Sequence, residues 1–173
     1  MPRMPNIFAN PSSRAVPLHL VASADAEAWL KAQGTRTQNS AASQSWTGKL
    51  GQILYVTENG LPILLSIGLG DASARKRKRF GAVADIANLP KAVFELVDPD
   101  PKVAQEFSLG FALSKYRFKR YAANAAPEAE LLCPPGCDEQ NLQVIIEGEF
   151  LTRDLINTPA NDMGPEELEA AVR

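Results

Sequence analysis

The sequence predicts an α/β fold in which helices flank one mixed β-sheet. Short runs rich in Val, Ile and Leu alternate along the chain with amphipathic segments, and the pair Asn59-Gly60 joins two of these runs as a hairpin. Hydrophobic residues make up 45% of the 173 residues and charged residues 22%, as in ordinary globular proteins. This apolar fraction is large enough to build a core.

Three strands and one helix are expected in the first half of the chain. A strand over 16–21 precedes a helix over 24–33, for which Ser23 is the expected N-cap and Gly34 the stop. The polar stretch 35–45 is expected to be a loop. Two further strands, 53–57 and 62–67, flank the hairpin turn at 58–61.

The second half is expected to be mainly helical. The predicted elements are a helix over 80–88, a strand over 92–97, a long helix over 102–118, a short strand over 131–133, and a helix from the Asp138 cap to about residue 156. On the long helix, spacings of three and four residues define a stripe expected to pack on the sheet. This stripe comprises Phe107, Phe111, Leu113 and Tyr116.

Three parts of the chain are distinguished. Residues 1–14, with three prolines, are expected to be a flexible lead-in, and 15–156 the α/β domain. Within 157–173, Pro159 ends one helix and Pro165 begins another, with Glu166 and Glu167 at its positive end. That helix stops after nine residues without a capping signal. We therefore expect 157–173 to be a linker and the truncated start of a second domain.

The charge is distributed unevenly. Residues 1–120 contain 16 Lys and Arg against 9 Asp and Glu, whereas 121–173 contain 2 against 11. Five of the basic residues form the run Arg75–Arg79. Such a run is either a nucleic-acid or localisation patch, or a solvated loop or exposed helix start. The second interpretation is favoured, because nucleic-acid modules spread basic residues over a face and interleave them with aromatic residues.

Few residues carry the chemistry of hydrolases or metal sites. His19 is the sole histidine and lies within an apolar strand, which favours a hydrogen-bonded core residue over a catalyst. Cys133 and Cys137 lack the further ligands of a zinc site and are expected to be free thiols rather than a disulfide. No stretch has the length of a membrane helix or the pattern of a signal peptide. A self-contained metalloenzyme is disfavoured.

Two weaker patterns are also compatible with a site. Gly68-Leu69-Gly70-Asp71 follows a strand, where a phosphate cradle could lie, but it lacks a third glycine and a Walker-type lysine. The alternative is a strand-end turn. Asp154 beside Arg153, and Glu166 beside Glu167, are explained by helix capping and dipole effects rather than by acid–base chemistry.

The segment 153–165, RDLINTPANDMGP, resembles the junction segment of the leucyl aminopeptidase (cytosol aminopeptidase) family of metallopeptidases. Weaker agreement runs through residues 46–51, 67–70 and 109–118, which resemble the N-terminal domain of bacterial members. The resemblance covers most of residues 16–173.

The resemblance implies a macro-domain-like N-terminal domain followed by a catalytic domain that removes N-terminal amino acids from peptides. Two divalent metal ions, Mn or Zn, and the catalytic residues would lie in that second domain, so no catalytic, cofactor-binding or metal residue is assigned here. The chain would serve assembly and access in a cytoplasmic homo-hexamer, with its own catalytic domain as partner and with neither nucleic acid nor membrane. The alternative is a free-standing macro-like module that binds a nucleotide or ADP-ribose.

Overall fold

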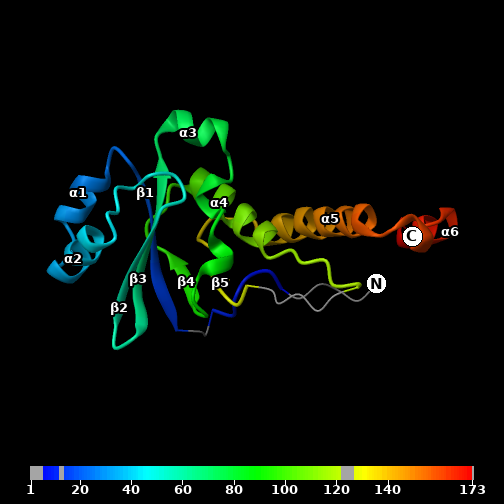
Figure 1. Ribbon diagram of the computed structural model, residues 1–173, viewed down its shortest axis with the longest axis horizontal. Coiled ribbons are helices and arrows are strands. Elements are labelled where there is room, and N and C mark those ends of the chain that lie inside the picture. Colours follow the sequence, from blue (N-terminus) through cyan, green and yellow to red (C-terminus); the bar gives the residue numbers. More distant parts are fainter. Residues whose placement is uncertain (1–5, 12–13, 122–126, 173) are drawn as a thin grey trace.

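The computed structural model describes residues 6–11, 14–121 and 127–172, and its described part is built around a five-stranded sheet (Figure 1). In chain order the strands and α-helices are β1 (Ala15–Ala22), α1 (Ala26–Lys31), α2 (Thr35–Ser43), β2 (Ile53–Glu58), β3 (Leu61–Gly70), α3 (Ala72–Arg77), β4 (Val93–Leu96), α4 (Pro101–Ser114), β5 (Glu130–Leu131), α5 (Glu139–Asn157) and α6 (Pro165–Val172). The short 3-10 turns are η1 (Gly81–Val83), η2 (Ile86–Asn88) and η3 (Ala160–Asp162). None of the helices in the described ranges is long and apolar enough to cross a bilayer.

The sheet has the order β2-β3-β1-β4-β5 and is mixed, which confirms the predicted fold class. β2 and β3 pair antiparallel, whereas β3, β1, β4 and β5 pair in parallel. The hairpin turn lies where it was expected, with positive φ angles of 51° at Asn59 and 79° at Gly60. Asn and Gly tolerate this conformation, and it matches the twist of the two strands.

Side chains from the two faces of the sheet enter two separate cores. On one face, Leu18, Ile67 and Phe94 pack with Phe107 and Phe111 of α4. On the other face, a smaller cluster forms around α1 and α2. It consists of Val21, Ala26, Ala41, Trp46, Leu54 and Val56. The helices therefore cover both faces, as expected for an α/β arrangement.

Residues 35–43 form the helix α2, so the prediction of a loop over 35–45 was wrong. The helix is polar, but it buries Thr37 and Ala41 against β2. The side chain of Gln44, its C-cap, accepts a hydrogen bond from Tyr55 N at 3.0 Å and donates one to Tyr55 O at 2.7 Å. The amide of Gln44 thus occupies hydrogen-bonding groups on the open edge of β2, where another strand could otherwise pair.

Three local details also differ from expectation. Ser23 does not cap α1: its hydroxyl donates to Gly48 O at 2.8 Å, and the N-cap position is occupied by Asp25. The expected helix over 80–88 is broken into η1 and η2. The long helix α4 ends at Ser114, four residues earlier than expected, because the chain turns there toward α5. The Asp138 cap of α5 is confirmed, since its side chain accepts from Asn141 N.

Residues 7–9, within the predicted lead-in, pack on the domain. Phe8 is buried in the main core, and Ala9 N donates to Leu131 O at 2.8 Å on β5. Ile7 N donates to the side chain of Gln143 in α5. These residues cover the second edge of the sheet. The prediction of a flexible lead-in also concerns residues 1–5 and 12–13, and these lie outside the described part of the chain.

The helix α5 leads away from the sheet and carries α6 to the far end of the molecule (Figure 1). Its N-terminal half is anchored by the buried residues Leu142 and Ile146, whereas Ile156 near its end is 76% exposed. The helix that was expected to begin at Pro165 is present as α6, and Leu168 on it is exposed. The α5–α6 arm is therefore the part of the chain that projects from the domain.

Candidate functional site

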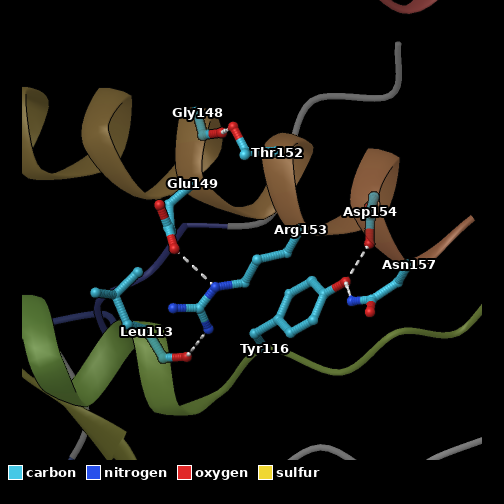
Figure 2. A network of polar contacts seen from close by, with 8 residues as sticks. All are labelled: Leu113, Tyr116, Gly148, Glu149, Thr152, Arg153, Asp154 and Asn157. Carbon is cyan, nitrogen blue, oxygen red and sulfur yellow. Dashed lines mark hydrogen bonds and ion pairs between the residues drawn. The ribbon is translucent and has the colours of Figure 1, made fainter. Parts of the chain in front are cut away.

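A polar network joins the end of α4 to the last turns of α5 (Figure 2). The phenol of Tyr116, just beyond α4, donates a hydrogen bond of 2.8 Å to Asp154 Oδ1. The same phenol oxygen accepts a hydrogen bond of 3.1 Å from Asn157 Nδ2. Asp154 and Asn157 lie on the same face of α5 because they are three residues apart. One tyrosine thus binds two side chains that lie three residues apart on the same face of the helix.

Arg153 strengthens the same junction. Its Nε donates to Glu149 Oε1 at 2.8 Å, and its Nη1 donates to the carbonyl of Leu113 at 3.5 Å. The guanidinium carbon lies 5.4 Å from the centre of the Tyr116 ring. An ion pair between side chains one helical turn apart contributes only about 0.3–0.5 kcal/mol at an exposed site. The direction of α5 therefore depends on several modest contacts that act together.

The ring of Tyr116 also packs on α5. It meets the ring of Phe150 edge-on, with centroids 5.1 Å apart and an interplanar angle of 62°. The expectation that Tyr116 packs against the sheet was wrong, because α4 ends before this residue and the following segment runs along α5. Burial raises the pKa of Tyr116; the bond from Asn157 opposes this shift and the bond to Asp154 supports it. The net shift is upward, so the phenol keeps its proton at neutral pH.

The end of α5 is closed by Thr158. Its hydroxyl donates to Asp154 O at 2.7 Å, its backbone amide donates to the same oxygen at 3.1 Å, and the residue is buried. Pro159, which follows, has no amide hydrogen to continue the helix. The turn before α6 is tied back to the domain by Tyr121, whose phenol donates to Asp162. The junction motif thus fixes where α5 ends and how the chain leaves it.

A groove of about 590 Å³ runs along this junction, between the segment after α4 and the α5–α6 arm. Its lining includes the apolar side chains of Phe150, Leu155 and Met163 and the cationic side chains of Lys115 and Lys119. Burial lowers the pKa of Lys115. The junction therefore presents a groove in which apolar side chains lie together with basic groups and with the carboxylates of Asp154 and Glu167.

The segment Gly68-Leu69-Gly70 forms the last three residues of β3 and not a turn after it, and its glycines serve packing. Gly68 N donates to Gln52 O at 2.8 Å and Gly70 N to Gly48 O at 3.0 Å, so both amides are already used. A Cβ on Gly68 would lie 2.1 Å from Lys49 O. Glycine is needed at position 68 because the backbone of the loop before β2, at Gly48 and Lys49, passes too close to leave room for a side chain. Asp71 accepts from Ala74 N at 2.7 Å and caps α3, and this bond lowers its pKa.

The basic run Arg75–Arg79 begins in the last turn of α3 and continues beyond it. Cations in that position stabilise the negative end of a helix. Arg79 also pairs with Glu106 of α4 at 3.4 Å. The run is exposed to solvent, as the favoured interpretation predicted, but it lies at the C-terminal end of its helix and not at the N-terminal start.

Neither His19 nor the two cysteines forms a reactive group. His19 is half-buried, its ring centroid is 5.2 Å from that of Trp29, and burial lowers its pKa. Cys133 and Cys137 are free and half-buried, and burial raises the pKa of Cys133 to about 11. A thiol with such a pKa is almost wholly protonated at neutral pH and is a poor nucleophile. Within the described ranges, no cluster of His, Cys, Asp or Glu could hold a metal ion.

The structure gives different roles to the two pairs that were explained by helix-end effects, Arg153 with Asp154 and Glu166 with Glu167. Glu167 accepts from Gly164 N at 2.9 Å, which confirms its capping role at α6. Arg153 and Asp154 are the centre of the junction network, so the explanation by helix-end effects alone was incomplete. The residue that was missed is Tyr116, and no local signal pointed to it, because its partners Asp154 and Asn157 lie 38 and 41 residues away in the sequence.

The chain matches a known protein family over most of its domain. Residues 16–134 match the model of the M17 aminopeptidase N-terminal domain. The chain is 28% identical over 145 residues to the probable cytosol aminopeptidase 1 of Shewanella oneidensis and 30% identical over 152 residues to the probable cytosol aminopeptidase of Clostridium perfringens. These alignments cover 72% and 73% of the chain but only 29% and 30% of the relatives. The chain therefore spans about a third of their length or less.

Two solved structures resemble the fold. The cytosol aminopeptidase from Coxiella burnetii superposes with a TM-score of 0.81 at 27% identity, over 94% of this chain and 35% of that enzyme. A mutant of tomato leucine aminopeptidase superposes with a TM-score of 0.61 at 17% identity, over 93% of this chain and 39% of that protein. The second likeness shows the fold alone.

Proposed function

Because the chain belongs to the M17 aminopeptidase family and matches its N-terminal domain, we propose that it is the accessory domain of a metal-dependent leucyl aminopeptidase, serving assembly and access. The match over residues 16–134 confirms the family and its N-terminal domain, which the resemblance had indicated. The proposed enzyme removes N-terminal amino acids from peptides. The reacting groups would then belong to a catalytic domain outside this chain.

The observation that carries the proposal is the position of the junction network. The segment 153–165, whose sequence resembles the junction segment of the family, contributes Asp154 and Asn157, and these bind Tyr116 and clamp α5 to the end of α4. Contacts at this place control the direction in which the chain leaves the domain. An accessory domain needs such control, because a rigid connection decides how a neighbouring domain is oriented.

The remaining properties follow from the family as proposals. Two divalent metal ions, Mn or Zn, would bind in the catalytic domain and activate a water molecule for attack on the peptide bond. The partners would be that catalytic domain and further copies of the protein in a homo-hexamer, with peptides as substrates and neither nucleic acid nor membrane. A cytoplasmic location is proposed from the relatives, which are named cytosol aminopeptidases.

A chimera tests the accessory role. The region of the Coxiella burnetii enzyme that superposes on this chain is replaced by the chain, and a second version lacks the region entirely. We expect the chimera to keep the parent's oligomeric state and its hydrolysis of leucine p-nitroanilide with Mn²⁺, and the deletion to lose its assembly. Hydrolysis by the 173-residue chain alone, or unchanged assembly after the deletion, would overturn the proposal.

The alternative of a free-standing ADP-ribose module is not favoured by the geometry. A diphosphate cradle at the end of β3 would need free amides, whereas Gly68 N donates to Gln52 O and Gly70 N donates to Gly48 O. Titration of the chain with ADP-ribose by calorimetry is the direct test, and saturable heat at one site would revive this alternative.

A further inference from the structure

A second crevice, of about 580 Å³, opens at the carboxyl ends of the parallel strands. It shares no lining residue with the junction groove. Leu20 and Ala22 come from the end of β1, Leu69 from the end of β3, and Asp98 follows β4. Its volume lies within the range of small-molecule pockets.

The strand connections explain why a crevice forms here. After β1 the chain passes to α1, which packs in the smaller core on one face of the sheet. After β3 the chain passes through α3, which buries no residue, to η1, and after β4 it passes to α4. Both η1 and α4 pack in the main core on the other face. Neighbouring strands that send their connections to opposite faces leave a gap between the loops. In open α/β sheets, ligands bind in such gaps.

The floor of the crevice is apolar. Leu69, Val83 and Phe107 line it and are buried, and Val103 beside them is half-buried. Phe80, 40% exposed, lies at its rim. An aliphatic or aromatic group of a ligand could leave water by contacting this floor.

The rim carries both signs of charge. Arg75 of α3 and Lys102 of α4 are cationic, whereas Asp25 before α1 and Asp98 after β4 are anionic. Of the other charged lining groups, Arg79 pairs with Glu106, and Asp100 accepts from Lys102 N and Val103 N as the cap of α4. The carboxylates of Asp25 and Asp98 would repel the negative charge of a phosphate group. A ligand that carries one positive and one negative group meets a partner for each.

We propose that this crevice binds a free α-amino acid with an apolar side chain. The ammonium group would lie toward Asp25 and Asp98, the carboxylate toward Arg75 and Lys102, and the side chain over the floor at Leu69. The inference does not depend on the proposed accessory role, because it concerns only residues of this domain.

The test is a titration of the full chain with L-leucine, followed by amide resonances in NMR. We expect saturable shifts at residues 22–25, 69–71 and 98–103, with a dissociation constant on the order of 1 mM. N-acetyl-leucine, which lacks the ammonium group, and leucinamide, which lacks the carboxylate, should each bind at least about tenfold more weakly.

Variants distinguish the two charged walls. Arg75→Gln and Asp98→Asn should each weaken L-leucine about tenfold or more, whereas the neighbouring changes Lys76→Gln and Glu95→Gln should leave binding unchanged. If Asp98→Asn does not fold, Asp25→Asn replaces it. Absence of saturable shifts up to about 10 mM L-leucine, or equal affinity for all three ligands, would overturn the proposal.

Discussion

Replacing Tyr116 by phenylalanine removes one oxygen atom from the junction and keeps the ring contact with Phe150. Two hydrogen bonds are lost, one to the carboxylate of Asp154 and one from the amide of Asn157. A neutral hydrogen bond contributes about 1 kcal/mol and one to a charged group about 1.5–3 kcal/mol. Because Asp154 and Asn157 are exposed and water can replace the phenol, the expected loss of unfolding free energy is about 1–2 kcal/mol.

For a chain of this length, 1 kcal/mol corresponds to a change of about 2–4 °C in melting temperature. Tyr116→Phe should therefore melt about 2–8 °C below the unchanged protein in calorimetry. A double-mutant cycle with Asp154→Ala should give a coupling energy of about 1 kcal/mol, since the two side chains are in direct contact. Tyr55→Phe, at a half-buried tyrosine of β2, is the matched control and should change stability by less than about 0.5 kcal/mol.

Two results would refute this reasoning. Equal melting temperatures for Tyr116→Phe and the unchanged protein would mean that the phenol contributes nothing to holding α5. Strict additivity of Tyr116→Phe and Asp154→Ala would mean that the two groups do not act on each other, and the network would then be a set of independent surface contacts.

Three further predictions concern the core, the pH dependence and the arm. Phe111→Ala should cost about 3–5 kcal/mol in urea unfolding, because the ring is 1% exposed within the main core. Burial lowers the pKa of His19, so the unfolded state takes up the proton at a higher pH than the folded state. The free energy of unfolding should therefore fall as the pH drops below 6.5 and become constant below the pKa of the folded state. The variant His19→Phe, which keeps the ring contact with Trp29, should reduce this pH dependence. Amide hydrogens over 160–172 should exchange fast in the dilute monomer, because α6 has eight residues and is largely exposed.

Each of these three predictions has a clear contrary result. An unchanged melting temperature in Phe111→Ala would show that the face of α4 has been misassigned. A slope between pH 7 and pH 5 that survives in His19→Phe would assign it to carboxylates instead. Strong protection of residues 160–172 would show that α6 packs firmly on its own domain.

Much of the fold was predictable because its signals are local. The left-handed turn at Asn59-Gly60, the cap at Asp138 and the proline at the start of α6 each act within a few residues of the chain. Such signals operate before any tertiary contact forms, so a reader of the sequence can recognise them. The family resemblance in residues 153–165 was likewise readable without coordinates.

The helix α2 could not be predicted from local signals. Its sequence, TRTQNSAAS, is polar and has little intrinsic preference for a helix. It is helical because Ala41 is buried beside β2 and because Gln44 binds the backbone of Tyr55, eleven residues away. These stabilising contacts exist only once the sheet has formed.

The junction depends on the tertiary structure in the same way. Tyr116 meets Asp154 across 38 residues of sequence and Asn157 across 41. No periodicity connects these positions, and the expected stripe on α4 assigned Tyr116 to the sheet. The residue types along the chain were sufficient to predict the strands, most helices and the family. Which polar side chains meet was decided by the end of α4 at Ser114, because that turn brings the phenol to the one face of α5 where partners are spaced to receive it.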